Sequence, residues 1–188
     1  MKNVMSFLKK SWPEVIRPGV VLLVFCICVS AALAVTNFIT APVIAEGELL
    51  RNNGSRVELF PAEAYNKLEG EWDGVAEAYD VVEGGEVIGH IVTGIANGYG
   101  GEVSVLVAFD PAGTVMGVEI LGDDETQGLG SKITEAEFKE QFKGLAAAEI
   151  TLNTEIQQIA SATVSSTAAV DAFNSAVAAY TVITGKEA

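Results

Sequence analysis

Residues 102–121, EVSVLVAFDPAGTVMGVEIL, decide the class of fold. Large apolar side chains occupy every second position over 103–109, which is the period of a β-strand. The DPAG segment at 110–113 has proline in its second position and glycine in its fourth, as is typical of a tight turn. Residues 115–121 follow as the partner strand. The stretch therefore predicts an antiparallel hairpin, which can bury one face and leave the other in water.

Two further strands are expected before this hairpin. Residues 75–82 and 87–95 are rich in apolar and β-branched side chains, and Gly84-Gly85 between them is a hairpin signal. Four strands joined by short turns predict an antiparallel meander.

Helices are expected after the strands. Thr134 and Glu137 match a capping box at the start of one helix. The apolar face of that helix would contain Phe138, Phe142 and Leu145. Apolar residues then recur at helical spacing near the C-terminus, at Val170, Phe173, Val177 and Tyr180. Ser165 or Ser166 would cap this last helix. The pattern predicts an α+β domain with a mainly antiparallel sheet flanked by helices.

A long apolar run precedes the domain. Residues 18–45 contain no charged side chain, and about 20 helical residues suffice to cross a bilayer. The first 17 residues carry a net charge of +3 and the remainder carries −17. Because basic flanks stay in the cytoplasm, we expect a cytoplasmic segment (1–17), a single transmembrane helix (18–40), a linker (41–56) and an extracytoplasmic domain (57–188). The linker contains NNGS at 52–55, which favours a turn.

A cleaved signal peptide is the alternative interpretation of this run. The flank is basic, and ALA at 32–34 resembles a cleavage site. The length of the apolar run favours a retained transmembrane helix in contact with the lipid bilayer.

Composition excludes several kinds of chemistry. A net charge of −14, from 25 acidic and 11 basic residues, argues against binding nucleic acid. The one histidine, His90, lies in a predicted strand, which favours a structural role and no metal site. Cys26 and Cys28 both lie in the apolar run, where packing is the simpler interpretation. Alternatively, one of them approaches a redox centre held mostly by another subunit. No catalytic acid, base or nucleophile is indicated.

Three segments suggest a ligand site: GYGG at 98–101, ETQGLG at 125–130 and SATVSST at 161–167. Glycines allow the backbone to approach a ligand closely. Hydroxyls at a helix N-terminus suit a phosphate, because the N–H groups there are free and the dipole is positive. Taken singly, the first two segments could be turns and the third an N-cap.

Taken together, these segments resemble the FMN-binding RnfG and NqrC subunits over nearly the whole chain. LFPA at 59–62 and the single N-terminal apolar helix extend the resemblance, and the chain length is nearer that of RnfG. The family joins FMN through its phosphate to the threonine of an S-G-A-T-x-[ST] motif, using a separate flavin transferase. That threonine corresponds to Thr163. Ala160-Ser161 replaces the S-G pair, Gln157 replaces an acidic residue and Gln127 replaces a proline.

The resemblance implies a site and a function. Besides Thr163, the FMN site would contain Tyr99, Gly100, Gly101, Glu125, Thr126, Gly128, Leu129, Gly130, Ser161, Ala162, Val164, Ser165 and Ser166. The chain would be the electron-carrying G subunit of an Rnf complex in a bacterial or archaeal cell membrane, which couples ferredoxin:NAD electron transfer to Na⁺ or H⁺ transport. Its partners would be membrane subunits with an iron–sulfur centre and a second flavin subunit. The alternatives are the C subunit of a sodium-pumping NADH:quinone oxidoreductase and a flavin-free, membrane-anchored binding or assembly module.

The charge asymmetry predicts the topology directly. An alkaline phosphatase that is active only outside the cytoplasm should be active when fused after Ala188 and inactive when fused after Lys10. The fusion after Ala188 should stay in the membrane fraction after a high-salt wash. Release into the soluble fraction would instead support the cleaved signal peptide.

Overall fold

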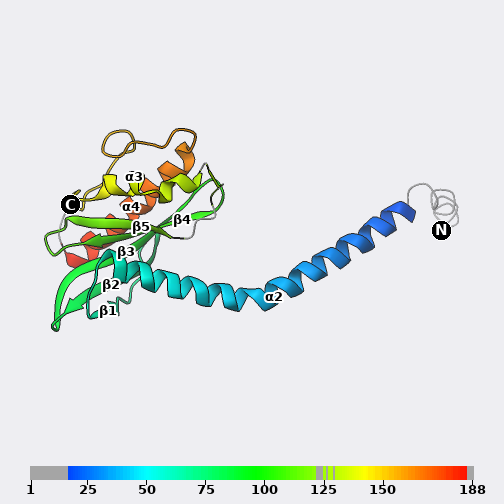
Figure 1. Cartoon of the computed structure of the whole chain (residues 1–188), viewed down its shortest axis with the longest axis horizontal. Coiled ribbons are helices and arrows are strands. Elements are labelled where there is room, and N and C mark those ends of the chain that lie inside the picture. Colours follow the sequence, from blue (N-terminus) through cyan, green and yellow to red (C-terminus); the bar gives the residue numbers. More distant parts are fainter. Residues whose placement is uncertain (1–16, 122–124, 126, 129, 186–188) are drawn as a thin grey trace. The chain divides into compact units, whose positions relative to one another are not determined.

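The computed structural model describes the chain except for residues 1–16, 122–124, 126, 129 and 186–188. It divides into two compact units, Met1–Arg51 and Asn52–Ala188. The elements run in the order α2 (Arg17–Leu59), β1 (Ala64–Lys67), β2 (Val75–Glu83), β3 (Glu86–Asn97), β4 (Glu102–Phe109), β5 (Val115–Leu121), α3 (Ala136–Lys139) and α4 (Thr163–Thr184). Single 3₁₀ turns at Gly130–Thr134 and Glu140–Phe142 flank α3. Figure 1 shows this order along the chain.

The sheet has five antiparallel strands in the sequential order β1 to β5. The expected α+β fold and the four-stranded meander are confirmed, and β1 adds an edge strand that the sequence analysis did not identify. Gly84 and Gly85 make the β2–β3 turn with φ values of 59° and 84°. Such left-handed angles favour glycine.

The β4–β5 turn is built around Asp110. Its Oδ1 accepts hydrogen bonds from the N–H groups of Ala112 and Thr114, both at 2.8 Å. Although burial raises the pKa of Asp110, these hydrogen bonds outweigh burial and hold the pKa below its ordinary value. Gly113 closes the turn at a φ of 94°, and its N–H donates to the carbonyl of Asp110.

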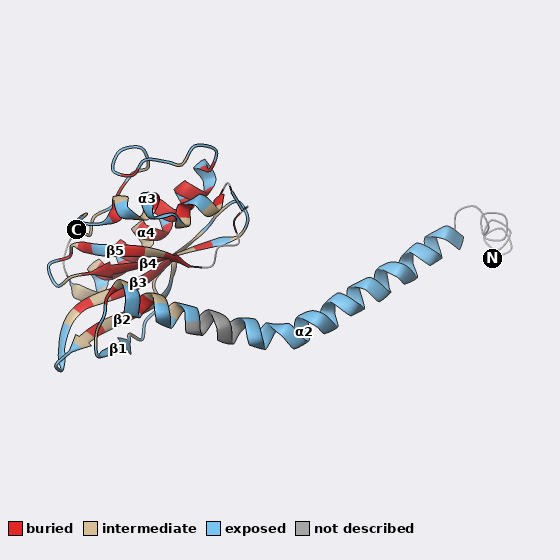
Figure 2. Cartoon of the chain, viewed as in Figure 1, coloured by how far each residue is buried: buried red, intermediate tan, exposed pale blue. Residues whose placement is uncertain are grey.

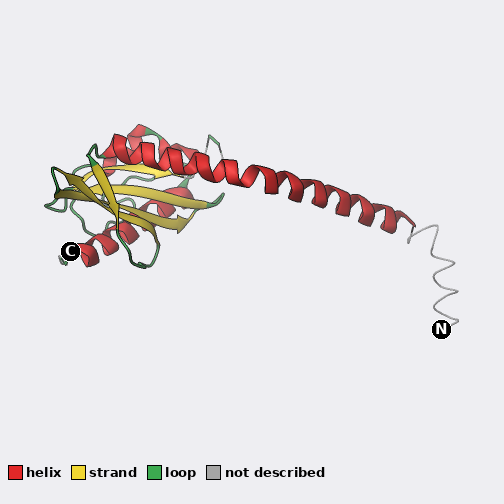
Figure 3. Ribbon diagram, turned by 90° about the horizontal axis from the view of Figure 1, so that it is seen from below, coloured by secondary structure: helices red, strands yellow, loops and turns green. Residues whose placement is uncertain are grey.

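Both faces of the sheet are buried, whereas the alternation pattern had suggested one face in water. The first face packs against α4 through residues such as Val105 and Phe109. The second face has its own apolar cluster of Phe60, Val81, Ile91, Leu106, Ala108 and Leu121. Figure 2 shows buried residues along the central strands, and in Figure 3 the strands lie between the end of α2 and the C-terminal helix. The sheet is therefore the middle layer of its unit.

The C-terminal end of α2 explains why the second face is covered. The expected turn at 52–55 is wrong, since α2 continues without interruption to Leu59. Arg56 is 7% exposed, stacks over the Tyr79 ring at 4.0 Å and lies 3.6 Å from the Glu77 carboxylate. These contacts, with the packing of Leu59 under the sheet, stabilise a helical conformation that an Asn-Gly pair by itself disfavours.

The Glu77 carboxylate lies at the centre of this contact. Burial raises its pKa, but hydrogen bonds from Lys67 Nζ at 2.8 Å and the Tyr79 hydroxyl at 2.9 Å outweigh burial and lower it overall. A pKa lower in the folded than in the unfolded chain means that the ionised carboxylate stabilises the fold, and this stabilisation is lost as the pH falls.

The first unit contains the candidate membrane anchor. Residues Arg17–Ile44 of α2, in which an 18-residue window reaches a mean hydropathy of 2.7, form one helix that is long and apolar enough to cross a bilayer. The predicted span at 18–40 lies within it. Among the described residues, no other helix meets this test.

The expected capping box is wrong. Helix α3 has only four residues, and Glu135, which precedes it, makes no side-chain cap. The Thr134 hydroxyl instead donates to the carbonyl of Ser131 at 2.8 Å, inside the preceding 3₁₀ turn. The apolar residues of this segment pack as expected: the Phe138 and Phe142 rings are 5.5 Å apart, and Phe142 lies 5.2 Å from Phe173 of α4.

Helix α4 lies against β3 and β4 at close range. A Cβ added to Gly94 of β3 would collide with the carbonyl of Ala172 and lie 3.2 Å from the main-chain N of Ala176. Further along the helix, Tyr180 stacks on Phe109 with ring centroids 4.4 Å apart. The observed close packing of α4 on the sheet therefore requires glycine at position 94.

Gly94→Ala tests this packing. We expect the free energy of unfolding to fall by about 2–3 kcal/mol, because backbone atoms of α4 would have to move. Gly54→Ala is the matched control. A Cβ there meets nothing within 4 Å in an exposed part of α2, so alanine should stabilise the helix by about 1 kcal/mol. Thermal unfolding of the full-length chain in detergent measures both, and equal melting temperatures would contradict the proposed role of Gly94.

Candidate functional site

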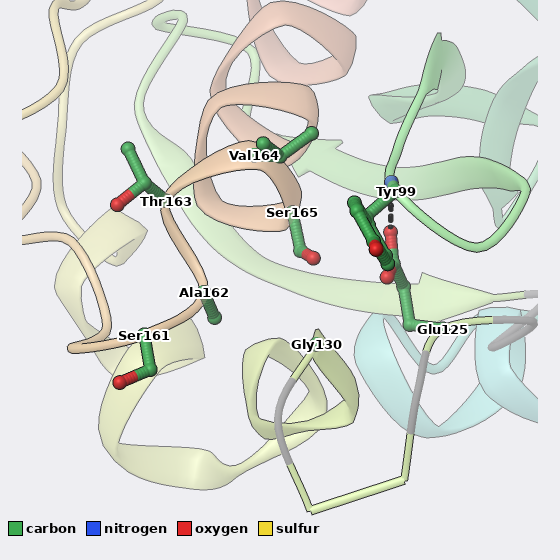
Figure 4. A pocket seen from close by; sticks show the side chains of 8 residues that line it. All are labelled: Tyr99, Glu125, Gly130, Ser161, Ala162, Thr163, Val164 and Ser165. Carbon is green, nitrogen blue, oxygen red and sulfur yellow. Dashed lines mark hydrogen bonds between the residues drawn. The ribbon is translucent and has the colours of Figure 1, made fainter.

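The three glycine- and hydroxyl-rich segments meet at one pocket. It has a volume of about 580 Å³ and is lined by Tyr99, Glu125, Gly130, Ser161, Ala162, Thr163, Val164 and Ser165. Figure 4 shows these side chains arriving from the β3–β4 loop, from the segment after β5 and from the start of α4. All eight lining residues belong to the set that the sequence predicted.

The remaining predicted residues lie around this pocket or outside the description. Gly100, Gly101, Gly128 and Ser166 are described but are not among the lining residues. Gly128 has a φ of 77°, and its N–H donates to Ser131 Oγ at 2.9 Å, which makes it a turn residue. Thr126 and Leu129 fall outside the described residues.

One wall of the pocket is the N-terminus of α4. Thr163 is the first residue of the helix and Ala162 is the N-cap. The first intrahelical hydrogen bond runs from Ser166 N to the Ala162 carbonyl at 2.9 Å. The N–H groups of residues 163–165 therefore have no acceptor within the helix. With the positive end of the helix dipole, they form a site suited to an anion.

The hydroxyls of this segment differ sharply in exposure. Ser165 and Ser166 are only 2% and 0% exposed, whereas Thr163 is exposed. Ser166 Oγ accepts a hydrogen bond from Ile159 N at 3.1 Å, and Thr167 donates to the carbonyl of Thr163 at 2.9 Å. In Figure 4 the Thr163 hydroxyl points away from Tyr99 and Glu125. Thr163 is thus an accessible hydroxyl at the helix start.

The expected N-cap at Ser165 or Ser166 is wrong. Both residues lie inside the first turn of α4, and the N-cap Ala162 has no side-chain oxygen with which to cap the helix. The Ser166 hydroxyl is used instead to hold the loop before the helix at Ile159. A hydroxyl-rich run does not reveal which of its members is buried, because that depends on the path of the preceding loop.

That loop is held by groups that the sequence analysis did not single out. The side-chain amide of Gln141 makes two hydrogen bonds with the main chain of Gln157. Gln157 N donates to Gln141 Oε1 at 2.7 Å, and Gln141 Nε2 donates to the Gln157 carbonyl at 3.4 Å. Asn174 of α4 bonds both the N–H and the carbonyl of Ile150, each at 3.0 Å. No sequence signal pairs these distant residues.

Glu125 is buried at the opposite wall. It is 5% exposed, and its Oε1 accepts a hydrogen bond from Tyr99 N at 2.8 Å. Its Oε2 accepts one from Gly100 N at 3.3 Å. Both oxygens of this carboxylate thus already accept hydrogen bonds from main-chain N–H groups.

The mouth of the pocket is partly apolar. Tyr99 is 74% exposed and Val164 is 51% exposed, so both present apolar surface to a ligand. Ala162, buried beneath them, adds a small side chain to the lining. Such a surface suits a flat aromatic ring, while the helix start beside it suits a negative charge.

Comparison with known proteins agrees with these features. Residues 98–178 match the model of the FMN-binding domain family, and residues 5–52 match that of the RnfG N-terminal region. The G subunit of the Na(+)-translocating ferredoxin:NAD(+) oxidoreductase complex of Acetobacterium woodii is 31% identical, covering 90% of this chain and 93% of that protein. This chain belongs to the RnfG family.

A second relative supports the same assignment. The G subunit of the proton-translocating ferredoxin:NAD(+) oxidoreductase complex of Clostridium ljungdahlii is 32% identical to this RnfG-family chain, over 87% of it and 90% of the relative. The similarity to the crystal structure of Shewanella oneidensis NqrC is weaker, with a TM-score of 0.46 and 17% identity over 58% of this chain and 62% of that one.

The RnfG-family pocket fits FMN by size and by chemistry. Its volume of about 580 Å³ lies within the range of roughly 300–1,000 Å³ typical of small-molecule sites. Free N–H groups at the start of α4 match the phosphate, and the apolar surfaces of Tyr99, Ala162 and Val164 match the ring system.

Ser161 has a strained backbone beside the site. Its φ is 70°, in the left-handed region, where a side chain costs about 1–2 kcal/mol. Ser161 occupies the position of the glycine in the S-G-A-T motif, and glycine adopts this conformation freely. The backbone geometry thus explains why the motif has glycine there.

Replacing Ser161 with glycine should relieve this strain. We expect Ser161→Gly to stabilise the fold by about 0.5–1 kcal/mol, because the added freedom of the unfolded chain offsets part of the gain. Ser161→Ala keeps the strain and removes only the hydroxyl, so it should show no gain. Chemical denaturation of the full-length chain measures both. Equal stabilisation by glycine and alanine would mean that the hydroxyl, and not the backbone, is responsible.

Proposed function

We propose that this protein is the electron-carrying G subunit of an ion-translocating ferredoxin:NAD oxidoreductase (Rnf) complex, with FMN attached covalently through its phosphate to Thr163 Oγ1. The observation that carries this proposal is the exposed Thr163 hydroxyl at the first position of α4, on the edge of the pocket. Ser165 and Ser166, two of its hydroxyl neighbours, are buried.

The start of α4 would hold the phosphate. The N–H groups of residues 163–165 precede the first intrahelical bond, so they are the donors available to phosphate oxygens. The dipole would favour the negative charge by about 0.3–1 kcal/mol at an exposed helix end. A phosphate esterified to the Thr163 hydroxyl would already lie at the start of α4, beside these N–H groups.

A separate flavin transferase would make the bond. An unactivated threonine hydroxyl is a weak nucleophile. In the described lining, Glu125 is the only carboxylate, and its oxygens already accept hydrogen bonds from Tyr99 N and Gly100 N. The pocket therefore supplies placement and electrostatics rather than a base for the attachment reaction.

The bound group would supply the one-electron and two-electron chemistry that the side chains of this pocket lack. Tyr99, Ala162 and Val164 would contact the flat ring and exclude water from it. Gly100 and Gly101 would shape the loop that presents Tyr99, and Gly128 and Gly130 would shape the segment that presents Glu125. Thr126 and Leu129 complete the set implied by the family motif.

The membrane arrangement follows from the charge pattern. The N-terminus would lie in the cytoplasm and the FMN-binding domain outside it, anchored by the single span within α2. Electrons would pass between an iron–sulfur centre of the membrane subunits and the flavin of another subunit. Cys26 and Cys28 are exposed on α2 in the chain by itself, so either could contact those membrane subunits.

Thr163→Ala tests the attachment site. The chain, coexpressed with a flavin transferase, should lose the flavin fluorescence that survives denaturation in SDS, because no hydroxyl remains at this position. Thr167→Ala is the matched control. Thr167 is an exposed threonine one turn later, and its hydroxyl bonds only the carbonyl of Thr163, so the covalent flavin should remain.

Ser166→Ala separates attachment from folding. It should retain covalent FMN but lower the free energy of unfolding by about 1 kcal/mol, because the N–H of Ile159 loses its acceptor. A peptide mass with FMN on any other hydroxyl, or fluorescence in Thr163→Ala after SDS, would overturn the assignment. A wild-type chain with no covalent flavin would favour a flavin-free binding or assembly module.

A further inference from the structure

Glu125 is the one buried carboxylate among the described residues. At 5% exposure an ionised carboxylate is costly unless donors replace the water that it has lost. Every other acidic residue whose exposure is described is at least partly exposed, so this burial needs a specific explanation.

The donors are two successive main-chain N–H groups. Tyr99 N donates to Oε1 at 2.8 Å and Gly100 N donates to Oε2 at 3.3 Å. Each oxygen thus engages one residue of the β3–β4 loop. Hydrogen bonds to an ionised acceptor are about twice as strong as neutral ones, so this carboxylate can hold the loop in one conformation.

The surrounding backbone is shaped to admit this side chain. A Cβ on Gly98 would collide with Glu125 Oε1. A Cβ on Gly130 would collide with Oε2 and lie 2.8 Å from Ser165 Oγ. Two glycines of the family-like segments are therefore required by the carboxylate. Although Gly130 lines the pocket, the Glu125 carboxylate by itself explains why this position has no side chain.

Three separate segments meet around this carboxylate. Glu125 comes from the segment after β5, Tyr99 and Gly100 from the β3–β4 loop, and Ser165 from the first turn of α4. Figure 4 shows Tyr99 and Glu125 joined by their hydrogen bond at one end of the pocket, with Ser165 between them and Thr163. The two hydrogen bonds of Glu125 thus join the Tyr99–Gly100 loop to the segment that packs, at Gly130, beside Ser165 of α4.

We infer that Glu125 is a positioning residue: its carboxylate holds the Tyr99–Gly100 loop against the start of α4 and so forms the pocket before FMN arrives, without binding FMN itself. The effect on FMN rests on the proposed function, but the hydrogen bonds between Glu125 and the loop exist in the chain without FMN. Because Glu125 lines the pocket, its negative charge also opposes electron uptake by a ring bound there. Its removal should therefore make the flavin potential more positive.

Glu125→Gln removes the charge and keeps the shape. The amide can still accept one of the two hydrogen bonds, but its NH₂ group would face an N–H donor. Losing charge-assisted hydrogen bonds should lower the equilibrium constant for holding the Tyr99–Gly100 loop in this conformation roughly tenfold or more, and the initial rate of covalent FMN loading should fall, by up to the same factor. The residual flavin should show an altered visible spectrum and a more positive midpoint potential.

Glu125→Asp and Glu102→Gln complete the set. Aspartate keeps the charge but is one methylene shorter, so it should restore only part of the loading rate. Glu102 follows the same loop at the start of β4 and is exposed, so Glu102→Gln makes the same charge change near the site. It should leave the loading rate, spectrum and potential unchanged.

Amide chemical shifts test the contact without FMN. In the full-length flavin-free chain in detergent, the amide protons of Tyr99 and Gly100 should lie downfield and move upfield in Glu125→Gln but not in Glu102→Gln. These shifts are informative even if the wild-type chain never acquires FMN, an outcome that would defeat the proposed function by itself.

Two results would overturn the inference while the proposed function stands. In the first, Glu125→Gln loads FMN at the wild-type rate with an unchanged potential. In the second, loading is lost although the Tyr99 and Gly100 amides do not shift. That second result would make Glu125 a direct FMN contact.

Discussion

The close approach of helix α4 to strand β3 is the constraint on which the candidate site depends. Gly94 leaves no room for a side chain beneath Ala172, and the small residues of the helix let the two backbones approach. With α4 packed this closely on the sheet, its first residue, Thr163, lies beside the pocket that the Tyr99 loop after β3 also lines. Packing in the middle of helix α4 thus positions Thr163 and the free N–H groups at the start of the helix.

Polar groups around the pocket divide into two kinds. The buried ones, Glu125 and Ser166, bond to backbone N–H groups of loops and hold those loops in place. The exposed hydroxyl of Thr163 and the free N–H groups at the start of α4 remain available to a ligand. Burial therefore separates residues that organise the site from those that can react, although both kinds occur in the same short motifs.

The covered second face of the sheet makes the end of α2 a layer of the folded unit. A boundary at 57 would remove Arg56, whose guanidinium stacks on Tyr79 and pairs with Glu77. The second compact unit of the structure spans Asn52–Ala188. Residues 52–59 are both the end of α2 and a layer of this unit, because Leu59 and Phe60 cover the apolar side chains of the sheet's second face.

Local patterns predicted the central strands well. Alternation and turn residues placed β2 to β5 close to their observed bounds, because a strand's period and a glycine's left-handed φ are properties of a few adjacent residues. Strand β1 was missed since AYNK is short and largely exposed. The capping box at Thr134 failed because that hydroxyl has a competing acceptor three residues earlier, at Ser131.

The amino-acid sequence by itself determined the apolar span, the antiparallel meander, the C-terminal helix and the three motif segments, all of which depend on neighbours in the chain. Only the tertiary structure decided that these segments share one pocket, that Thr163 is exposed while Ser165 and Ser166 are buried, and that Glu125 bonds a loop 25 residues away. The physical reason is that burial and hydrogen-bond partners are set by how helix α4 and the loops pack across the sheet, and that packing joins residues far apart in sequence.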